Sequence, residues 1–173
     1  MDATELLRPG LLAGLTIAVT DEAAAEGLRA LGAATPVLAP AFALDDDALA
    51  AAATELGAVD VLVADGRALY DAAGGGLPGL RAAADGCFAA ARALVNAAFI
   101  PAARGKIVLL APEDASTAAA LENTARTLSI EWARHGIVIT CVHARARTDA
   151  LVAFLCSPAG DYYSGCAFGW PPT

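Results

Sequence analysis

The chain has 173 residues, a formal net charge of −8 and a hydrophobic share of 57%, in which alanine is the commonest residue. This length suits one domain with a substantial core, so we expect a single domain over residues 1–173. The acidic balance argues against nucleic acid or an anionic membrane surface as a partner, because both require clustered positive charge.

Membrane insertion and secretion are also not indicated. The most apolar stretch, residues 87–103, is interrupted by Arg92, Asn96 and Pro101, and falls short of the roughly 18 uninterrupted apolar residues of a membrane span. The first ten residues lack the basic and apolar regions of a signal peptide. Four widely spaced cysteines without a CxxC pair are typical of reduced, buried thiols. We therefore expect a cytoplasmic protein.

Apolar runs alternate with helical segments along the whole chain. Buried strands are predicted at residues 15–20, 35–38, 59–64, 107–110, 137–142 and 166–170. Helices are predicted at residues 22–31, 45–57, 80–98, 116–133 and 150–155, and a loop at residues 66–79. About six strands that alternate with helices predict an α/β fold: a Rossmann-like, doubly wound parallel sheet in a single three-layer domain.

The clearest unit in this pattern spans residues 105–142. An apolar run is followed by a helical segment with Leu121, Ala125, Leu128 and Trp132 on one face, which we expect to end at His135 and Gly136. A second apolar run comes next. Strand, helix and strand with apolar strands predict a right-handed βαβ unit in a parallel sheet that is covered on both faces.

The same stretch carries a family resemblance. LSIEWARHGIVITCV is similar to a pattern of the short-chain dehydrogenases/reductases, the Rossmann-type oxidoreductases that transfer hydride to or from NAD(P). LTIAVT resembles the first strand of that family, and GAVDVLVADG a later one. SPAGDYYSG resembles a C-terminal element. Members of that family are considerably longer, so the resemblance implies a shortened relative. The residues in register are Glu131, Ala133, Gly136, Ile137, Val138, Val142, Tyr162, Ser164 and Gly165.

The resemblance also shows what is missing. The reaction of the family uses a tyrosine as acid/base, a lysine four residues later, a serine and an asparagine. These four positions fall on Asp114, Ala118, Ala111 and Ala83, and no Tyr-x-x-x-Lys occurs in the chain, whose single lysine is Lys106. A phenol needs a nearby cation to lower its pKa for this role. We therefore expect no catalytic residues of the family type.

The cofactor loop has changed as well. In the family, glycines after the first strand let the backbone approach the pyrophosphate. Here Asp21 follows Thr20 and no glycine comes before Gly27, and a carboxylate repels an anionic ligand. We expect no bound cofactor, although a vestigial cleft remains at Thr20, Asp21, Ala64, Asp65 and Gly66.

Other candidate sites have a plainer interpretation. Gly74, Gly76 and Gly79 match G-x-G-x-x-G, but they follow no strand directly and indicate a surface loop. Cys141 and His143 lack further ligands, so we expect no metal. Three interpretations stay open from the sequence: His135 at a helix C-terminus, Glu113 with Asp114 as a carboxylate pair in the cleft, and Arg145 with Arg147 as solvated cations or contacts to an acidic partner.

We therefore expect a non-catalytic subunit that forms a homo- or hetero-oligomer with a chain of the same family. The alternatives are an NAD(P)-dependent oxidoreductase with a rearranged cofactor site, and an enzyme of another class that uses the emptied cleft. In the family, the helices that correspond to residues 80–98 and 116–133 pair across a two-fold axis. The resemblance implies an interface at Phe88, Val95, Ala120, Leu121, Thr124, Leu128 and Trp132.

Overall fold

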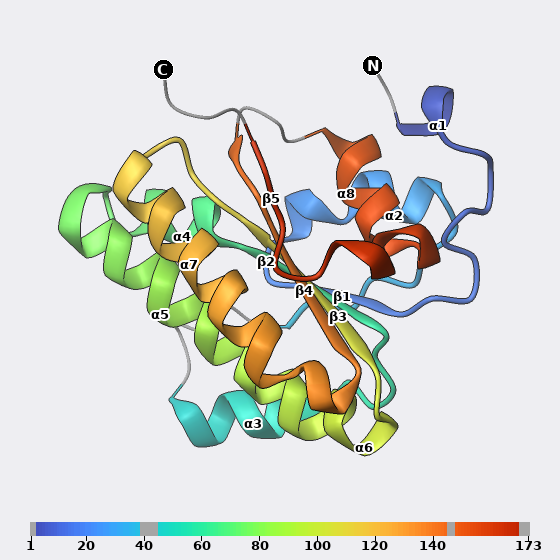
Figure 1. Cartoon of the computed structure of the whole chain (residues 1–173), viewed down its shortest axis with the longest axis horizontal. Coiled ribbons are helices and arrows are strands. Elements are labelled where there is room, and N and C mark those ends of the chain that lie inside the picture. Colours follow the sequence, from blue (N-terminus) through green and yellow to red (C-terminus); the bar gives the residue numbers. More distant parts are fainter. Residues whose placement is uncertain (1–2, 39–44, 145–147, 170–173) are drawn as a thin grey trace.

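The computed structural model of the chain describes residues 3–38, 45–144 and 148–169. Its five strands form one parallel sheet in the order β1-β2-β3-β4-β5 (Figure 1). The first four strands are almost entirely buried, as their continuous apolar runs predict. The strands are β1 (Ile17–Val19), β2 (Val61–Asp65), β3 (Gly105–Leu110), β4 (Ile137–Val142) and β5 (Ala167–Phe168).

The predicted strand at residues 35–38 does not form a continuous ladder, so the expectation of about six strands is corrected to five. This segment lies beside β1 and makes only two isolated bridges, Thr16 with Ala34 and Val19 with Val37. Pro36 lies between the two bridges. Proline has no N–H to donate, so it interrupts the hydrogen bonding at this edge of the sheet.

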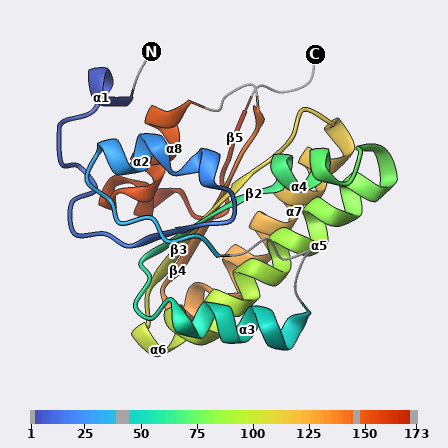
Figure 2. The ribbon, with the colours of Figure 1, turned by 180° about the vertical axis from the view of Figure 1, so that it is seen from behind.

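Helices cover both faces of the sheet and make three layers, which confirms the predicted fold class (Figures 1 and 2). Successive residues of β3 lie on opposite faces of the sheet: Ile107 and Leu109 belong to one core, and Val108 and Leu110 to the other. The first core packs under α3 (Asp46–Glu55), α5 (Gly76–Leu94) and α7 (Ala115–Glu131), and the second under α1 (Ala3–Leu6), α2 (Glu26–Ala30) and α8 (Asp149–Cys156).

The expected loop at residues 66–79 is wrong, because most of this segment is helical. A short helix, α4 (Gly66–Ala72), follows β2 directly, and α5 already begins at Gly76. Asp65 starts α4 by accepting hydrogen bonds from two amides of its first turn. A Cβ on Gly66 would lie 2.7 Å from Leu121 Cδ1 and 3.0 Å from Leu110 O, so a larger residue would crowd this turn.

Helix α5 continues through a π-helical turn (Val95–Phe99) and α6 (Ile100–Ala102). By length and composition the stretch Gly76–Ala102 could cross a membrane, but 56% of its most apolar window is buried inside the fold, as in a core helix. Helix α7 passes into a 3-10 turn (Ala133–His135). The chain then turns at Gly136, whose φ is 68°, so the α-helix itself ends at Glu131, before the predicted end at His135 and Gly136.

Candidate functional site

A cleft of about 600 Å³ opens at the carboxyl ends of β2 and β3. In parallel α/β sheets this edge carries the ligand sites, because the helices that follow the strands start there. Of the five residues predicted to form a vestigial cleft, only Asp65 lines this one, whereas Thr20, Asp21, Ala64 and Gly66 are not among its lining residues. The lining residues are Asp65, Arg67, Tyr70, Asp71, Leu110, Ala111, Pro112, Glu113, Asp114 and Ala144.

The turn after β1 is capped by a carboxylate of the chain itself. Asp21 caps a 3-10 helix (Glu22–Ala24), and its carboxylate accepts a 2.7 Å hydrogen bond from the Ala23 amide. A helix N-terminus binds an anion through such amides. Here a side chain of the protein already occupies one of them and brings its own negative charge.

The turn after β2 is built around a buried carboxylate. Asp65 is wholly buried, and its Oδ1 accepts from the amides of Arg67 at 3.0 Å and Ala68 at 3.1 Å. The Arg67 guanidinium lies 3.3 Å from Oδ2. The Asp65 amide donates to the Thr20 hydroxyl at 2.8 Å, which ties the ends of β1 and β2 together. Two amides and a cation compensate for the burial of this charge.

The turn after β3 follows the same pattern. Asp114 caps α7 and accepts from the amide of Thr117 at 2.8 Å and from its hydroxyl at 2.6 Å. These bonds hold the pKa of the Asp114 carboxyl below its usual value. The three other positions implied by the family resemblance hold buried methyl groups, which transfer no proton: Ala83, Ala111 and Ala118.

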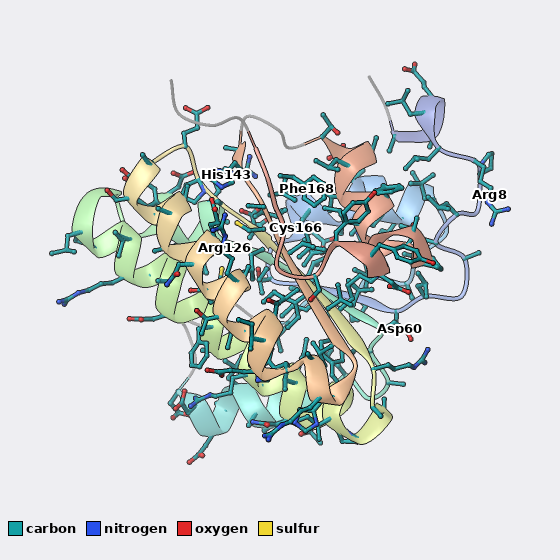
Figure 3. All side chains as sticks on the ribbon, viewed as in Figure 1. Arg8, Asp60, Arg126, His143, Cys166 and Phe168 are labelled. Atoms are coloured by element: carbon teal, nitrogen blue, oxygen red, sulfur yellow. The ribbon has the colours of Figure 1, made fainter. Side chains whose placement is uncertain are left out.

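At the end of β4, His143 belongs to a network that the sequence reasoning missed. Its Nε2 lies 3.0 Å from Glu122 Oε2, and Glu122 Oε1 lies 2.6 Å from the Arg126 guanidinium. Figure 3 shows His143 and Arg126 close together where β4 ends beside α7. The spacing of Glu122 and Arg126, four residues apart on a helix, was the available signal. Cys141, the other proposed metal ligand, is buried, and burial raises the pKa of its thiol to about 12.

Tyr70, which lines the cleft, was also missed by the sequence reasoning, since residues 66–79 were expected to be a loop. Its phenol oxygen accepts a 3.0 Å hydrogen bond from the Gly76 amide at the start of α5. Glu113 and Asp114, the proposed carboxylate pair, both line the same cleft. Within residues 3–38, 45–144 and 148–169, no three His, Cys, Asp or Glu side chains gather in a group that could hold a metal ion.

The glycines of the G-x-G-x-x-G match serve the packing of helices. Gly74 and Gly76 have φ values of 79° and 58° in the turn between α4 and α5, and Gly79 is buried. A Cβ on Gly79 would lie 2.7 Å from the Tyr70 ring. His135 accepts a hydrogen bond from the neighbouring Arg134 at 3.0 Å. Arg145 and Arg147 lie outside the described residues.

Three residues of the predicted interface belong to the core of the single chain. Val95, Leu121 and Leu128 are buried among the residues under α5 and α7, which corrects their assignment to a surface. They occupy the helix stripe that faces the sheet. Phe88 is 41% exposed, while Ala120, Thr124 and Trp132 are partly exposed.

Comparison with known proteins gives a match in structure alone. No protein-family model and no curated protein matches the chain. Among solved structures, a hydroxysteroid dehydrogenase from Escherichia coli matches with a TM-score of 0.66 at 17% identity, over 92% of this chain and 96% of that one. A gluconate 5-dehydrogenase from Burkholderia cenocepacia, in complex with NADP and tartrate, matches with a TM-score of 0.68 at 18% identity, over 91% and 93% of the two chains.

A structure described as a ribose-5-phosphate isomerase from Brucella melitensis matches with a TM-score of 0.71 at 18% identity, over 92% of this chain and 91% of that one. Likeness at such identities establishes the fold and leaves the reaction open. The chain therefore shares the α/β fold of these solved dehydrogenase structures over most of its length.

Proposed function

We propose that this chain is a non-catalytic cytoplasmic subunit that keeps the dehydrogenase fold and pairs with a second chain of that fold. One observation carries the proposal. The first turns after β1, β2 and β3 are capped by the chain's own carboxylates, Asp21, Asp65 and Asp114. The helix N-termini at which an anion could bind are thus already occupied by carboxylates of the chain itself.

A dinucleotide would meet repulsion at this edge. Its pyrophosphate needs free amides and close approach of the backbone, whereas Asp21 supplies a competing acceptor and a like charge. Hydride transfer also needs a group that exchanges a proton with the substrate. The matching positions hold methyl groups at Ala83, Ala111 and Ala118. The cap at Asp114 is engaged by Thr117.

The outer surface of α5 and α7 supports the second half of the proposal. Ile130 is 79% exposed and Phe88 is 41% exposed on these two helices. Large exposed apolar side chains are typical of contact surfaces. We define the α5/α7 face by Phe88, Ala119, Ala120, Thr124, Thr127 and Ile130, all exposed or partly exposed.

Two helices from each chain would form a four-helix interface at this face. Small residues such as Ala119 and Ala120 let helix backbones approach closely. A permanent interface of this kind buries roughly 2,000 Å² or more in total. Sedimentation velocity tests directly whether the chain pairs with a second chain. We expect a dimer, or a complex with a partner from the host. A monomer with no partner would refute it.

A second candidate function rests on the cleft. Its volume of about 600 Å³ and its lining by Tyr70, Glu113 and Asp114 suit an enzyme of another class, or a rearranged NAD(P) site. Titration with NADH and NADPH, followed by fluorescence and melting temperature, separates the subunit from an oxidoreductase with a rearranged NAD(P) site. The subunit proposal predicts no binding at ordinary concentrations. A dissociation constant in the low micromolar range or tighter would favour the enzyme.

A further inference from the structure

The segment after α8, residues 157–169, lies along the open edge of β4, and we refer to it as the strap. It contains a 3-10 helix (Pro158–Tyr163) and the two-residue strand β5. So short a strand gives the strap little hold on the sheet by itself. Its backbone hydrogen bonds to β4 include Gly165 N–H to Ile139 O at 2.8 Å, Cys141 N–H to Cys166 O at 3.0 Å, and His143 N–H to Phe168 O at 2.8 Å.

The first part of the strap is held by the single lysine of the chain. Lys106 lies on β3, and its side chain is only 8% exposed. Its ammonium donates to Ser157 O at 2.5 Å and to Cys156 O at 3.5 Å. It also forms an ion pair with Asp161 Oδ1 at 2.6 Å. The buried charge is thus directed at the end of α8 and the start of the strap.

The last part of the strap reaches the carboxyl end of β4. Gly169 lies against His143 so closely that a Cβ would be 2.6 Å from that of the histidine. His143 is held by Glu122, and the next residue, Ala144, lines the cleft. In Figure 3, Asp60, which lines the cavity beside Lys106, lies at the other end of the sheet from His143. The strap therefore runs along β4, from Lys106 at one end of the sheet to the wall of the cleft at the other end.

We propose that the contact of Lys106 with Asp161 is a latch: when it opens, the strap leaves β4 and His143 loosens beside the cleft, while the remaining sheet stays folded. The exposures of the two partners suit a latch. Asp161 is 58% exposed and can swing into water, whereas Lys106 stays in place on a central strand. Further side-chain contacts of the strap include the aromatic pairs of Tyr163 with Phe154 and Phe168, at 5.9 and 5.4 Å, and a 2.7 Å hydrogen bond from the Ser157 hydroxyl to Phe154 O.

Loss of the Lys106 charge should destabilise the strap before it destabilises the rest of the fold. The ammonium satisfies carbonyl oxygens at the C-terminal end of α8, where intrahelical donors are lacking. Buried acceptors that lose a charged donor are destabilised more than those that lose a neutral one. Helix α8 itself is anchored independently, since Val152, Ala153 and Leu155 are buried in the second core. The strap is anchored less deeply, because its residues Tyr163, Ala167 and Phe168 are only partly buried against the two cores.

Amide hydrogen exchange by NMR tests the latch. In Lys106→Met, we expect the amides of Cys141, His143 and Gly165 to exchange roughly tenfold faster or more, from the usual strength of charged hydrogen bonds. The amides of Thr20 and Ala111, which bond to Val63 and Val142, should stay unchanged. Equal acceleration at all five amides would show a general stabiliser and overturn the proposal, as would no change at any of them.

Two further variants keep the test decisive. Asp161→Asn leaves Lys106 and the two carbonyl contacts in place, so it should fold and give the same local pattern with a smaller amplitude, even if Lys106→Met does not fold. Arg104→Met is the matched control, because Arg104 is a neighbouring cation paired with Asp60 at 3.0 Å and largely exposed. It should leave the three strap-dependent amides unchanged. Unaltered exchange in Asp161→Asn, or the strap pattern in Arg104→Met, would contradict the latch.

Discussion

The amide of Asp65 donates a 2.8 Å hydrogen bond to the hydroxyl of Thr20, and both residues are buried. This bond joins the carboxyl ends of β1 and β2 behind the cleft. It also holds Asp65 in the position from which its carboxylate caps α4. The buried carboxyl ends of β1 and β2 are thus held together by a polar network within the chain.

Thr20→Val should therefore destabilise the protein. Valine has nearly the shape of threonine but no acceptor for the Asp65 amide, so we expect the free energy of unfolding to fall by about 1–3 kcal/mol. Urea denaturation measures the change. Thr20→Ser keeps the hydroxyl and should lose much less. Equal stability of the valine variant and the unmodified protein would show that the bond contributes nothing.

The cap at Asp114 predicts a pH dependence with a definite sign. Hydrogen bonds from Thr117 lower the pKa of this carboxyl in the folded state. A lowered pKa gives stability that is present above the unfolded value of about 3.9 and is lost as pH falls through the folded pKa. Urea midpoints of the unmodified protein and Asp114→Asn should therefore converge as pH is lowered below about 4. A constant difference down to pH 2 would contradict this origin.

The cysteines should differ sharply in reactivity. Burial raises the pKa of the Cys87 thiol, and raises those of Cys141 and Cys156 to about 12, while Cys166 is exposed. Because the thiolate is the reactive form, a thiol reagent at pH 8 should label only Cys166 in the folded protein. All four thiols should react in denaturant. Rapid labelling of a second cysteine under native conditions would contradict the packing described.

The order of elements could be predicted from the sequence, and the contacts at their ends could not. The apolar runs that became β2, β3 and β4 need burial on both faces, and that need alone indicates a parallel sheet. The segment after Asp65 was misread because its glycines suggest a loop. Whether Asp65 would cap a helix depended on its burial, which is a tertiary property. The Tyr70 side chain in the cleft was missed for the same reason.

The assignment of the interface failed in part for a geometric reason. Leu121 and Leu128 lie on the most apolar stripe of α7, and a helix on a sheet turns that stripe inward. The outward residues, such as Ala120 and Thr124, carry a weaker apolar signal. The contact of His143 with Glu122 joins residues 21 positions apart, and no local pattern predicts it.

The α5/α7 face gives a direct mutational prediction. Ala120→Glu or Thr124→Glu should dissociate the complex, because an unpaired charge would enter a dry helix contact. Sedimentation velocity at several concentrations measures the effect. Ala30→Glu is the control, since Ala30 is exposed on α2 on the opposite face of the sheet and should leave assembly unchanged. Equal dissociation by all three variants would show that the effect is not specific to this face.

The central claim is that the chain assembles and does not bind a dinucleotide, and native mass spectrometry of the protein gently purified from its own host tests both parts at once. The chain alone has a mass of 17.3 kDa. We expect a species that contains two copies, or one copy with a second chain of dehydrogenase fold, and no NAD(P) on this subunit. A species at the mass of the single chain, or a single chain carrying a dinucleotide, would contradict the account.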